Sequence, residues 1–359
     1  MTTPSRQNMR YFRPAAFAVL AVMASGPRPD AQGLPYALFE RYLEQLRVET
    51  AIPGISGVIV QGGRVVWAAG LGKQDLERSI DASDDTLYPI GDLTQTFAAV
   101  LVGQCVDRVG LNINQPIRRW TDSIPESSAT LRHVLSHSST GVPGEAFRYD
   151  PARYAALTNV VGDCADRPFR AAVHHEIFGR LGMKDSVPGR DLAVPGTADR
   201  ALFEDGDLVH FTDVLQRLAT PYRVDRGGKA TQSEYPAEDV NAATGLISTA
   251  QDLGRFDSAL GQLLAGELLS VAWSNVTTSS GAPLPSGLGW FVQSYNGERL
   301  VWHFGVTPGA ASSLLVKVPR RDLTLILLAN SDGLSPASIS EGDVTASLFA
   351  KLFLRLFVA

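Results

Sequence analysis

The chain has 359 residues, of which 45% are hydrophobic and 19% are charged, and its formal net charge is -5. This composition supports a large buried core and excludes a disordered or fibrous protein. No basic run occurs beyond the first residues, which argues against binding to nucleic acid. We therefore expect a globular protein, for which small neutral or cationic ligands remain open.

The first 31 residues have the pattern of an export signal. Arg6, Arg10 and Arg13 precede an apolar run of small residues at 14–24. That run is too short to cross a bilayer, and proline and glycine residues end it. Residues 1–31 are therefore predicted to be a signal peptide and leader. The mature chain is predicted to be periplasmic or secreted, with no integral membrane segment.

Cys105 and Cys164 are the only cysteines in the sequence. An oxidising compartment permits a disulfide between them, and two buried free thiols are the alternative. The sequence leaves both open.

Two elements follow the leader. Apolar residues recur at helical spacing between 35 and 49, which predicts an amphipathic helix. Two β-prone runs, at 55–61 and 64–69, are joined by Gly62-Gly63, which predicts a hairpin.

Helical periodicity and loops dominate the middle of the chain, and β-prone runs return near its end. The run at 323–329 is apolar throughout, which is typical of a central strand with both faces covered. A helix over about 343–357 closes the chain. The other predicted helices are 97–109, 131–136, 154–162, 169–181 and 250–264, and the other predicted strands are 288–294, 300–303 and 312–318.

Strands at both ends of the chain, with helices between them, predict an α+β fold. Its antiparallel sheet is formed by both chain ends and flanked by helices, with an inserted helical lobe. We expect a single domain over 32–359, with a sheet lobe at about 34–90 and 285–359 and a helical lobe at about 91–284. The cleft between the lobes is the expected ligand site.

Several short segments, in a fixed order, carry a family resemblance. They are 88–97 (YPIGDLTQTF), 131–139 (LRHVLSHSS), 143–149 (PGEAFRY), 244–253 (TGLISTAQDL) and 302–305 (WHFG). Together they resemble the serine β-lactamase and penicillin-binding-protein family, which includes class C β-lactamases, D-alanyl-D-alanine carboxypeptidases and related serine hydrolases. The resemblance implies the β-lactamase/transpeptidase-like fold.

In active relatives the first segment carries S-x-x-K, with the serine as nucleophile and the lysine as its activator. Here Asp92 holds the serine position and Gln95 holds the lysine position. A carboxylate is a weak nucleophile toward an amide, and a glutamine side chain cannot accept a proton at neutral pH. We therefore expect no acyl transfer by the family mechanism.

The resemblance also assigns positions in the cleft. Tyr149 keeps the proton-shuttle tyrosine of the family's Y-x-N motif, whereas Pro151 replaces its asparagine. His303 and Gly305 belong to the strand where K-T-G or H-x-G is usual. The backbone N–H of Val306, with that of the residue at the serine position, would form the oxyanion hole.

These substitutions predict an exported and catalytically degenerate family member that binds a small molecule, a peptide, a cell-wall fragment or a protein partner in its cleft. No cofactor is expected. No metal site is expected either, because no glutamate of an H-E-x-x-H motif lies between His133 and His137. The adjacent His174 and His175 point to different faces of a helix.

Alternatives to this function stay open. Ser136, Ser138 or Ser139 could supply another nucleophile for a β-lactam, D-alanyl peptide or ester substrate. Asp92 and Asp150 could form a carboxylate pair that hydrolyses a glycosidic bond, which requires a separation below about 10 Å. The structural alternative for Asp92 is a helix cap, worth about 1 kcal/mol.

Overall fold

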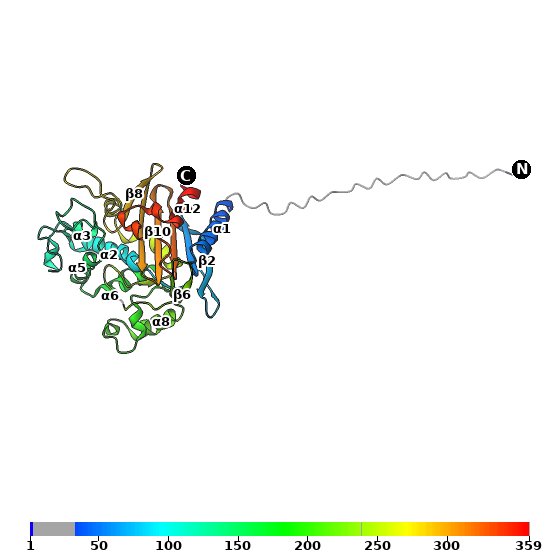
Figure 1. Ribbon diagram of the computed structural model, residues 1–359, viewed down its shortest axis with the longest axis horizontal. Coiled ribbons are helices and arrows are strands. Elements are labelled where there is room, and N and C mark those ends of the chain that lie inside the picture. The colour runs from blue at the N-terminus through cyan, green and yellow to red at the C-terminus, as the bar shows by residue number, and fades with distance from the viewer. Residues whose placement is uncertain (3–32, 238, 359) are drawn as a thin grey trace.

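The computed structural model describes residues 1–2, 33–237 and 239–358 of the chain (Figure 1). The predicted signal peptide and leader lie almost entirely outside the described residues. Across the described ranges, no helix has both the length and the apolar character needed to span a membrane.

Seven antiparallel strands form the central sheet, and they come from both ends of the chain. The junction is the pairing of β1 with β11, in which Ile55 lies opposite Ala329 and Gln61 opposite Leu323. The predicted α+β fold, with a sheet completed by both termini, is therefore confirmed. In spatial order the strands are β3 (Ile80–Asp81), β2 (Arg64–Asp75), β1 (Gly54–Gln61), β11 (Leu323–Ala329), β10 (Ala311–Val318), β9 (Glu298–Thr307) and β8 (Phe291–Tyr295).

The hairpin of β1 and β2 forms where the sequence predicts it. Gly62 and Gly63 have φ angles of 59° and 69°. A two-residue turn that matches the twist of its strands requires such left-handed angles, which glycine adopts without strain.

All seven residues of β11 are buried, as the apolar run predicts. Helices cover both faces of the sheet at this strand. On one face lie α1 (Leu34–Glu49) and α12 (Leu348–Phe357), whose Phe39 and Phe353 rings are 6.4 Å apart (Figure 1). On the other face lies α9 (Ala250–Ser258) of the helical lobe.

The helical lobe is inserted between β3 and β8. Its central helix α2 is buried on every side from Thr94 to Val102, which places its first turn deep in the molecule. The disulfide Cys105–Cys164 joins α2 to α5, so the structure pairs the two cysteines. The helices of this lobe are α2 (Thr94–Val109), α3 (Leu131–Leu135), α4 (Pro151–Tyr154), α5 (Leu157–Ala165), α6 (Phe169–Val173), α7 (Gly179–Leu181), α8 (Asp205–Leu215), α9, α10 (Leu260–Leu263) and α11 (Gly266–Ala272). Its short strands pair as β4 (Tyr88–Pro89) with β7 (Ile247–Ser248) and as β5 (Tyr222–Val224) with β6 (Ala230–Gln232).

Several element boundaries differ from the sequence prediction. The helix expected over 154–162 is divided between α4 and α5. The closing helix begins at Leu348 rather than 343, because the Ser347 side chain caps it by accepting a hydrogen bond from the Ala350 N–H. Strand β9 continues four residues past 303, since Gly305 and its neighbours pair with β10.

Candidate functional site

Asp92 lies in a single 3₁₀ turn, η1 (Gly91–Leu93), immediately before α2. Glycines bring this turn against β9. A Cβ added at Gly91 would lie 2.8 Å from the Val306 nitrogen, and one added at Gly305 would lie 2.9 Å from the Asp92 nitrogen. Only residues without side chains allow the two backbones to approach this closely.

The backbone nitrogens of Asp92 and Val306 therefore belong to two segments in direct contact. Strand β8 pairs with β9 only as far as Trp302, so η1 occupies the edge of β9 beyond that point. The Ser313 hydroxyl fixes the junction by donating to the Ile90 carbonyl at 2.8 Å. This arrangement is compatible with the predicted oxyanion hole, which stays a prediction.

A continuous series of hydrogen bonds, called here the Asp92 chain, connects His137, Gln95, Tyr149 and Asp92. The Asp150 N–H donates to His137 Nδ1 at 3.1 Å. His137 Nε2 lies 2.9 Å from Gln95 Oε1, and Gln95 Nε2 donates to the Tyr149 hydroxyl at 3.2 Å. The Tyr149 hydroxyl in turn hydrogen-bonds the Asp92 side chain.

The donor and the acceptor of each hydrogen bond in the Asp92 chain follow from the bond between the Asp150 N–H and His137 Nδ1. Because His137 Nδ1 accepts a backbone N–H, its Nε2 carries the proton and donates to the Gln95 amide oxygen. The Gln95 amide nitrogen then donates to Tyr149, whose proton is left to point at the Asp92 carboxylate. The series therefore ends at the Asp92 carboxylate, which accepts a hydrogen bond from the Tyr149 hydroxyl.

The members of the Asp92 chain other than Asp92 are neutral at neutral pH. Burial, followed by the nearby His303, lowers the pKa of His137 to about 3. Burial also lowers the pKa of His303 to about 4. Burial, followed by the charge of Asp92, raises the pKa of the Tyr149 hydroxyl well above its usual value. A tyrosine in this state donates a proton in a hydrogen bond but does not accept one as a base.

Aromatic packing holds the imidazole of the Asp92 chain. The His137 ring lies 4.5 Å from the Tyr149 ring and 5.1 Å from the Tyr154 ring. His137 has a φ of 50°, a left-handed conformation that a non-glycine residue adopts at some energetic cost. The Tyr154 hydroxyl also donates to the Gln95 carbonyl at 3.1 Å. These contacts fix the imidazole opposite Gln95.

An ion pair anchors the loop that carries Tyr149. Arg153 Nη1 and Nη2 donate to the two Glu126 carboxylate oxygens at 2.6 and 3.0 Å. Arg153 Nη1 also donates to the Ser139 carbonyl at 3.1 Å, and Glu126 accepts the Gly141 N–H at 3.0 Å. The hydrogen bonds from Arg153 lower the pKa of Glu126 to about 2.

Some predicted site residues have structural partners. Asp150 caps α4 by accepting the Arg153 N–H at 3.1 Å, and its carboxylate lies 3.4 Å from Arg153 Nε. Pro151 is the first residue of α4, where its missing N–H costs nothing. The cap position of α2 is Leu93, which makes no side-chain capping bond. The helix-cap interpretation of Asp92 stays a prediction.

His303 and the three candidate serines are buried. His303 is only 1% exposed, and its Nδ1 lies 2.7 Å from the Phe304 carbonyl oxygen and 2.9 Å from the Phe304 nitrogen. Ser136 and Ser138 are fully buried and 2.9 Å apart, and Ser139 is 2% exposed. His133 accepts the Thr130 N–H at the start of α3. Its imidazole and that of His137 therefore serve different partners.

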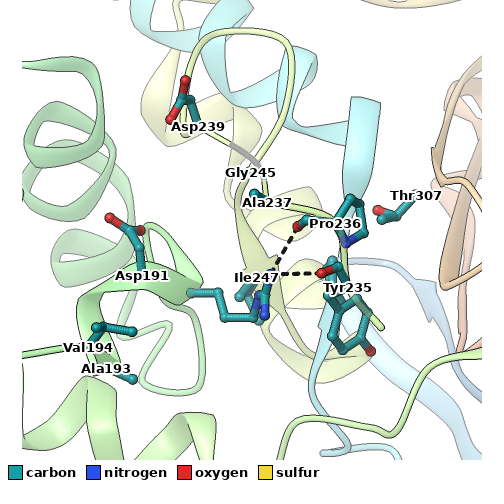
Figure 2. A pocket seen from close by; sticks show the side chains of 12 residues that line it. Asp191, Ala193, Val194, Tyr235, Pro236, Ala237, Asp239, Gly245, Ile247 and Thr307 are labelled. Atoms are coloured by element: carbon teal, nitrogen blue, oxygen red, sulfur yellow. Dashed lines mark hydrogen bonds between the residues drawn. The ribbon is translucent and has the colours of Figure 1, made fainter. Parts of the chain in front are cut away.

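A cavity of about 460 Å³ lies beside the end of β9 (Figure 2). Thr307, the residue after Val306, lines it together with Pro89. Asp92 and Tyr149 are not among its lining residues. The Thr307 side chain is 3% exposed, and its Oγ1 has no hydrogen-bond partner among the described residues. The rest of the lining is Arg190, Asp191, Ala193, Val194, Tyr235, Pro236, Ala237, Asp239, Gly245 and Ile247.

Two charged residues of this cavity, Arg190 and Asp191, have defined partners. Arg190 Nη2 donates to the carbonyls of Tyr235 and Pro236 at 3.3 and 2.9 Å, drawn as dashed lines in Figure 2. The Arg190 guanidinium also lies 5.4 Å from the centre of the Tyr235 ring. Asp191 pairs with Arg170 at 3.0 Å. None of these residues has a signal in the sequence, because their grouping depends on the folded loops. The partners of His137 and Arg153 likewise have no signal in the sequence.

Comparison with known proteins places this geometry in a family. The model of the Beta-lactamase family matches residues 39–348. Protein flp of Staphylococcus aureus strain MW2 is 24% identical over 78% of this chain and 60% of its own length. Penicillin-binding protein 4* of Bacillus subtilis strain 168 is 21% identical over 76% of this chain and 67% of its own. The chain thus spans only about 60% of the length of protein flp.

Solved structures show the same fold. An octameric penicillin-binding protein homologue from Pyrococcus abyssi gives a TM-score of 0.71 at 20% identity, over 85% of this chain and 76% of that one. The D-amino acid amidase of Ochrobactrum anthropi SV3, solved with L-phenylalanine amide, gives 0.66 at 18% identity, over 89% and 97% of the two chains. Because the family model covers most of the sequence, the chain belongs to the Beta-lactamase family, among the serine β-lactamase and penicillin-binding-protein relatives.

Proposed function

We propose that this chain is an exported, catalytically degenerate member of its family, which binds a peptide, a cell-wall fragment or a partner protein in the cleft. The observation that carries the proposal is the Asp92 chain. Gln95 holds the position of the family's lysine and makes two hydrogen bonds there, to His137 and to Tyr149.

The directions of these hydrogen bonds oppose acyl transfer. A nucleophile needs a neighbour that can take its proton, and neither the Gln95 amide nor the donating Tyr149 hydroxyl offers a basic atom. His137 is the nearest imidazole in the series, but its Nδ1 is already occupied by the Asp150 N–H. The loss of a member of such a catalytic unit reduces turnover by several powers of ten.

The buried serines support the same proposal. Ser136 Oγ donates to the Arg132 carbonyl at 2.8 Å, and Ser138 shares a hydrogen bond with Ser136. Both side chains are closed off from solvent. A substrate would reach them only after the loop had been displaced, which disfavours a replacement nucleophile.

Acylation by a fluorescent penicillin, read by intact mass, tests the proposal. The wild-type protein is expected to show no adduct and no hydrolysis of nitrocefin. The double variant Asp92→Ser, Gln95→Lys restores the hydroxyl and the amine and is expected to gain a stoichiometric acyl adduct. The single variant Asp92→Ser is the matched control, since its serine lacks an activating base.

Turnover of nitrocefin or an activated ester by the wild-type protein, abolished by Asp92→Asn, would contradict the proposal. If the double variant stays inert, the triple variant with Pro151→Asn separates a missing amide from a closed cleft. Acylation of the triple variant alone would show that Pro151 also blocks the reaction.

Export is a separate part of the proposal. The disulfide between Cys105 and Cys164 supports it, because such bonds persist in oxidising compartments. Expression of the full chain in a Gram-negative host, followed by fractionation and N-terminal sequencing, is expected to yield a periplasmic product that begins after Ala24 or Ala31. A cytoplasmic product with an intact N-terminus would contradict export.

A further inference from the structure

A second cavity, of about 190 Å³, lies between α8 and the helical segment that contains α6 and α7. It shares no lining residue with the 460 Å³ cavity, so it is a separate space. An apolar cavity of about 150 Å³ is large enough to bind benzene. The second cavity therefore has room for one six-membered ring with a small substituent. Its lining residues are His174, Phe178, Gly179, Gly182, Met183, Lys184, Ser186, His210 and Phe211.

One wall of this cavity is formed by an unusual turn of helix. Between α6 and α7 the backbone makes a π turn, η3 (His174–Phe178), in which the Gly179 N–H donates to the His174 carbonyl five residues earlier. Such turns are rare and occur frequently at functional sites. His174, Phe178 and Gly179 all belong to the lining. The rare backbone geometry therefore coincides with the wall of the cavity.

Aromatic rings and a thioether line the cavity. The His174 ring meets the Phe211 ring edge to face, with the ring centres 5.3 Å apart, and the His210 ring lies 6.3 Å from the same phenylalanine. Phe178 and Met183 complete this part of the lining. Aromatic rings pack favourably against one another and against methionine sulfur. An aromatic ring is therefore the ligand body that this lining favours.

The other polar side chains of the lining narrow the hydrogen bonds that a ligand can make. The Ser186 hydroxyl lies 2.8 Å from the Ser248 hydroxyl and 2.9 Å from the Asp252 carboxylate, so its single proton is already donated. His210 Nε2 lies 2.7 Å from the Lys184 carbonyl oxygen and therefore carries a proton, which leaves Nδ1 of the neutral ring as an acceptor.

His174 presents an acceptor without a partner. Its Nε2 lies 3.5 Å from the Asp207 carboxylate, so the proton of the neutral ring is on the nitrogen that faces the carboxylate. Burial lowers the pKa of His174, which keeps the ring neutral at pH 7. Its Nδ1 is enclosed and has no hydrogen-bond partner among the described residues. A buried acceptor of this kind is energetically unfavourable until a donor reaches it.

We propose that the second cavity binds a single-ring phenol, whose ring packs against Phe178, Met183 and Phe211 and whose hydroxyl donates to His174 Nδ1. The ring matches the size and the aromatic lining of the cavity, and the hydroxyl supplies the hydrogen bond that the imidazole lacks. The site is separate from the cleft, so it stands whether or not the cleft is degenerate.

Methionine NMR tests the proposal at the site itself. The sequence contains four methionines, three of them within the first 23 residues, so Met183 is the only one near a lining residue. The full chain is labelled with methyl-¹³C methionine, Met183→Leu assigns the resonance, and phenol and benzene are titrated at pH 7. Phenol is expected to shift the Met183 resonance saturably, with a dissociation constant in the millimolar range.

His174→Phe removes the acceptor and keeps an aromatic ring in its place. This variant is expected to bind phenol at least about fivefold more weakly and to bind benzene within about twofold of the wild type. His175→Phe is the matched control, because His175 is the adjacent, exposed histidine and does not belong to the lining. It is expected to keep both affinities, and melting temperatures show whether each variant is folded.

Three outcomes overturn the proposal. The first is the absence of a saturable Met183 shift with phenol at about 20 mM, a concentration at which fragments of this size bind. The second is an equal loss of phenol affinity in the two histidine variants, and the third is a parallel loss of phenol and benzene in His174→Phe. If His174→Phe does not fold, the nuclear Overhauser effect between the phenol ring and the Met183 methyl group of the wild type decides: its presence supports the site and its absence overturns it.

Discussion

Two buried polar side chains, Lys317 and Gln95, are stabilised in different ways. Between β10 and α9, Lys317 Nζ lies 2.9 Å from Asp257 and 3.0 Å from Thr324, so a buried ammonium is paired with a carboxylate. At the first turn of α2, where relatives bury a lysine, Gln95 instead connects two neutral partners. The fold can hold a buried lysine, and at position 95 this chain has an amide. Position 95 is therefore held by hydrogen bonds between neutral groups rather than by an ion pair.

The largest expected effect is the loss of stability when Lys317 is removed from its buried ion pair with Asp257. Lys317→Met leaves the fully buried Asp257 carboxylate without its cation, which is expected to cost about 3–5 kcal/mol of unfolding free energy. Urea denaturation measures the loss. The double variant with Asp257→Leu is expected to recover much of it, and a loss below about 1 kcal/mol in the single variant would mean that the pair is not a charged one.

Acid is expected to lower the stability of the region around Gln95, where His137 and His303 are neutral. The folded-state pKa values of His137 and His303 are about 3 and about 4, below the ordinary value near 6.5. The unfolded chain therefore binds more protons in this window, so the stability that comes from neutral imidazoles is complete above pH 6.5 and is lost as the pH falls. At pH 5 each histidine is expected to have lost about 2 kcal/mol. Urea midpoints at pH 7 and pH 5 measure this loss, and His137→Gln should reduce the difference. An unchanged difference in that variant would count against a neutral His137.

The smallest expected effect is the loss of stability when Gln95 on α2 is replaced. Gln95→Met leaves the His137 N–H and the Tyr149 hydroxyl each short of a partner, and is expected to cost about 1–3 kcal/mol. Gln104→Met on the same helix is the matched control, because Gln104 donates one long hydrogen bond to the Leu263 carbonyl at 3.4 Å and its amide oxygen has no partner among the described residues. Thermal melting should rank Gln95→Met as the more destabilised variant. The reverse order would mean that the Asp92 chain adds little to stability.

The sheet could be predicted from the sequence because its signals are local. The Gly62-Gly63 turn, the apolar run of β11 and the helical spacing of α1 each fix an element without reference to distant residues. The order and spacing of the motifs also located Asp92, Gln95 and Tyr149.

The contacts between elements could not be predicted in this way. That His137 faces Gln95 depends on the left-handed turn after α3, and that Asp150 caps a helix depends on where α4 begins. The burial of His303 could not be predicted, because a resemblance assigns a position in a strand but not the packing above it. The cavity brings together residues near 190, 235 and 307, and no periodicity connects segments so far apart.

The covalent link between α2 and α5 closes residues 105–164 into a ring that contains His137, Tyr149 and Arg153. The segment opposite the N-terminus of α2 is therefore tethered at both of its ends. A protease that cuts once inside this ring produces a nicked protein whose two pieces stay attached until a reductant is added.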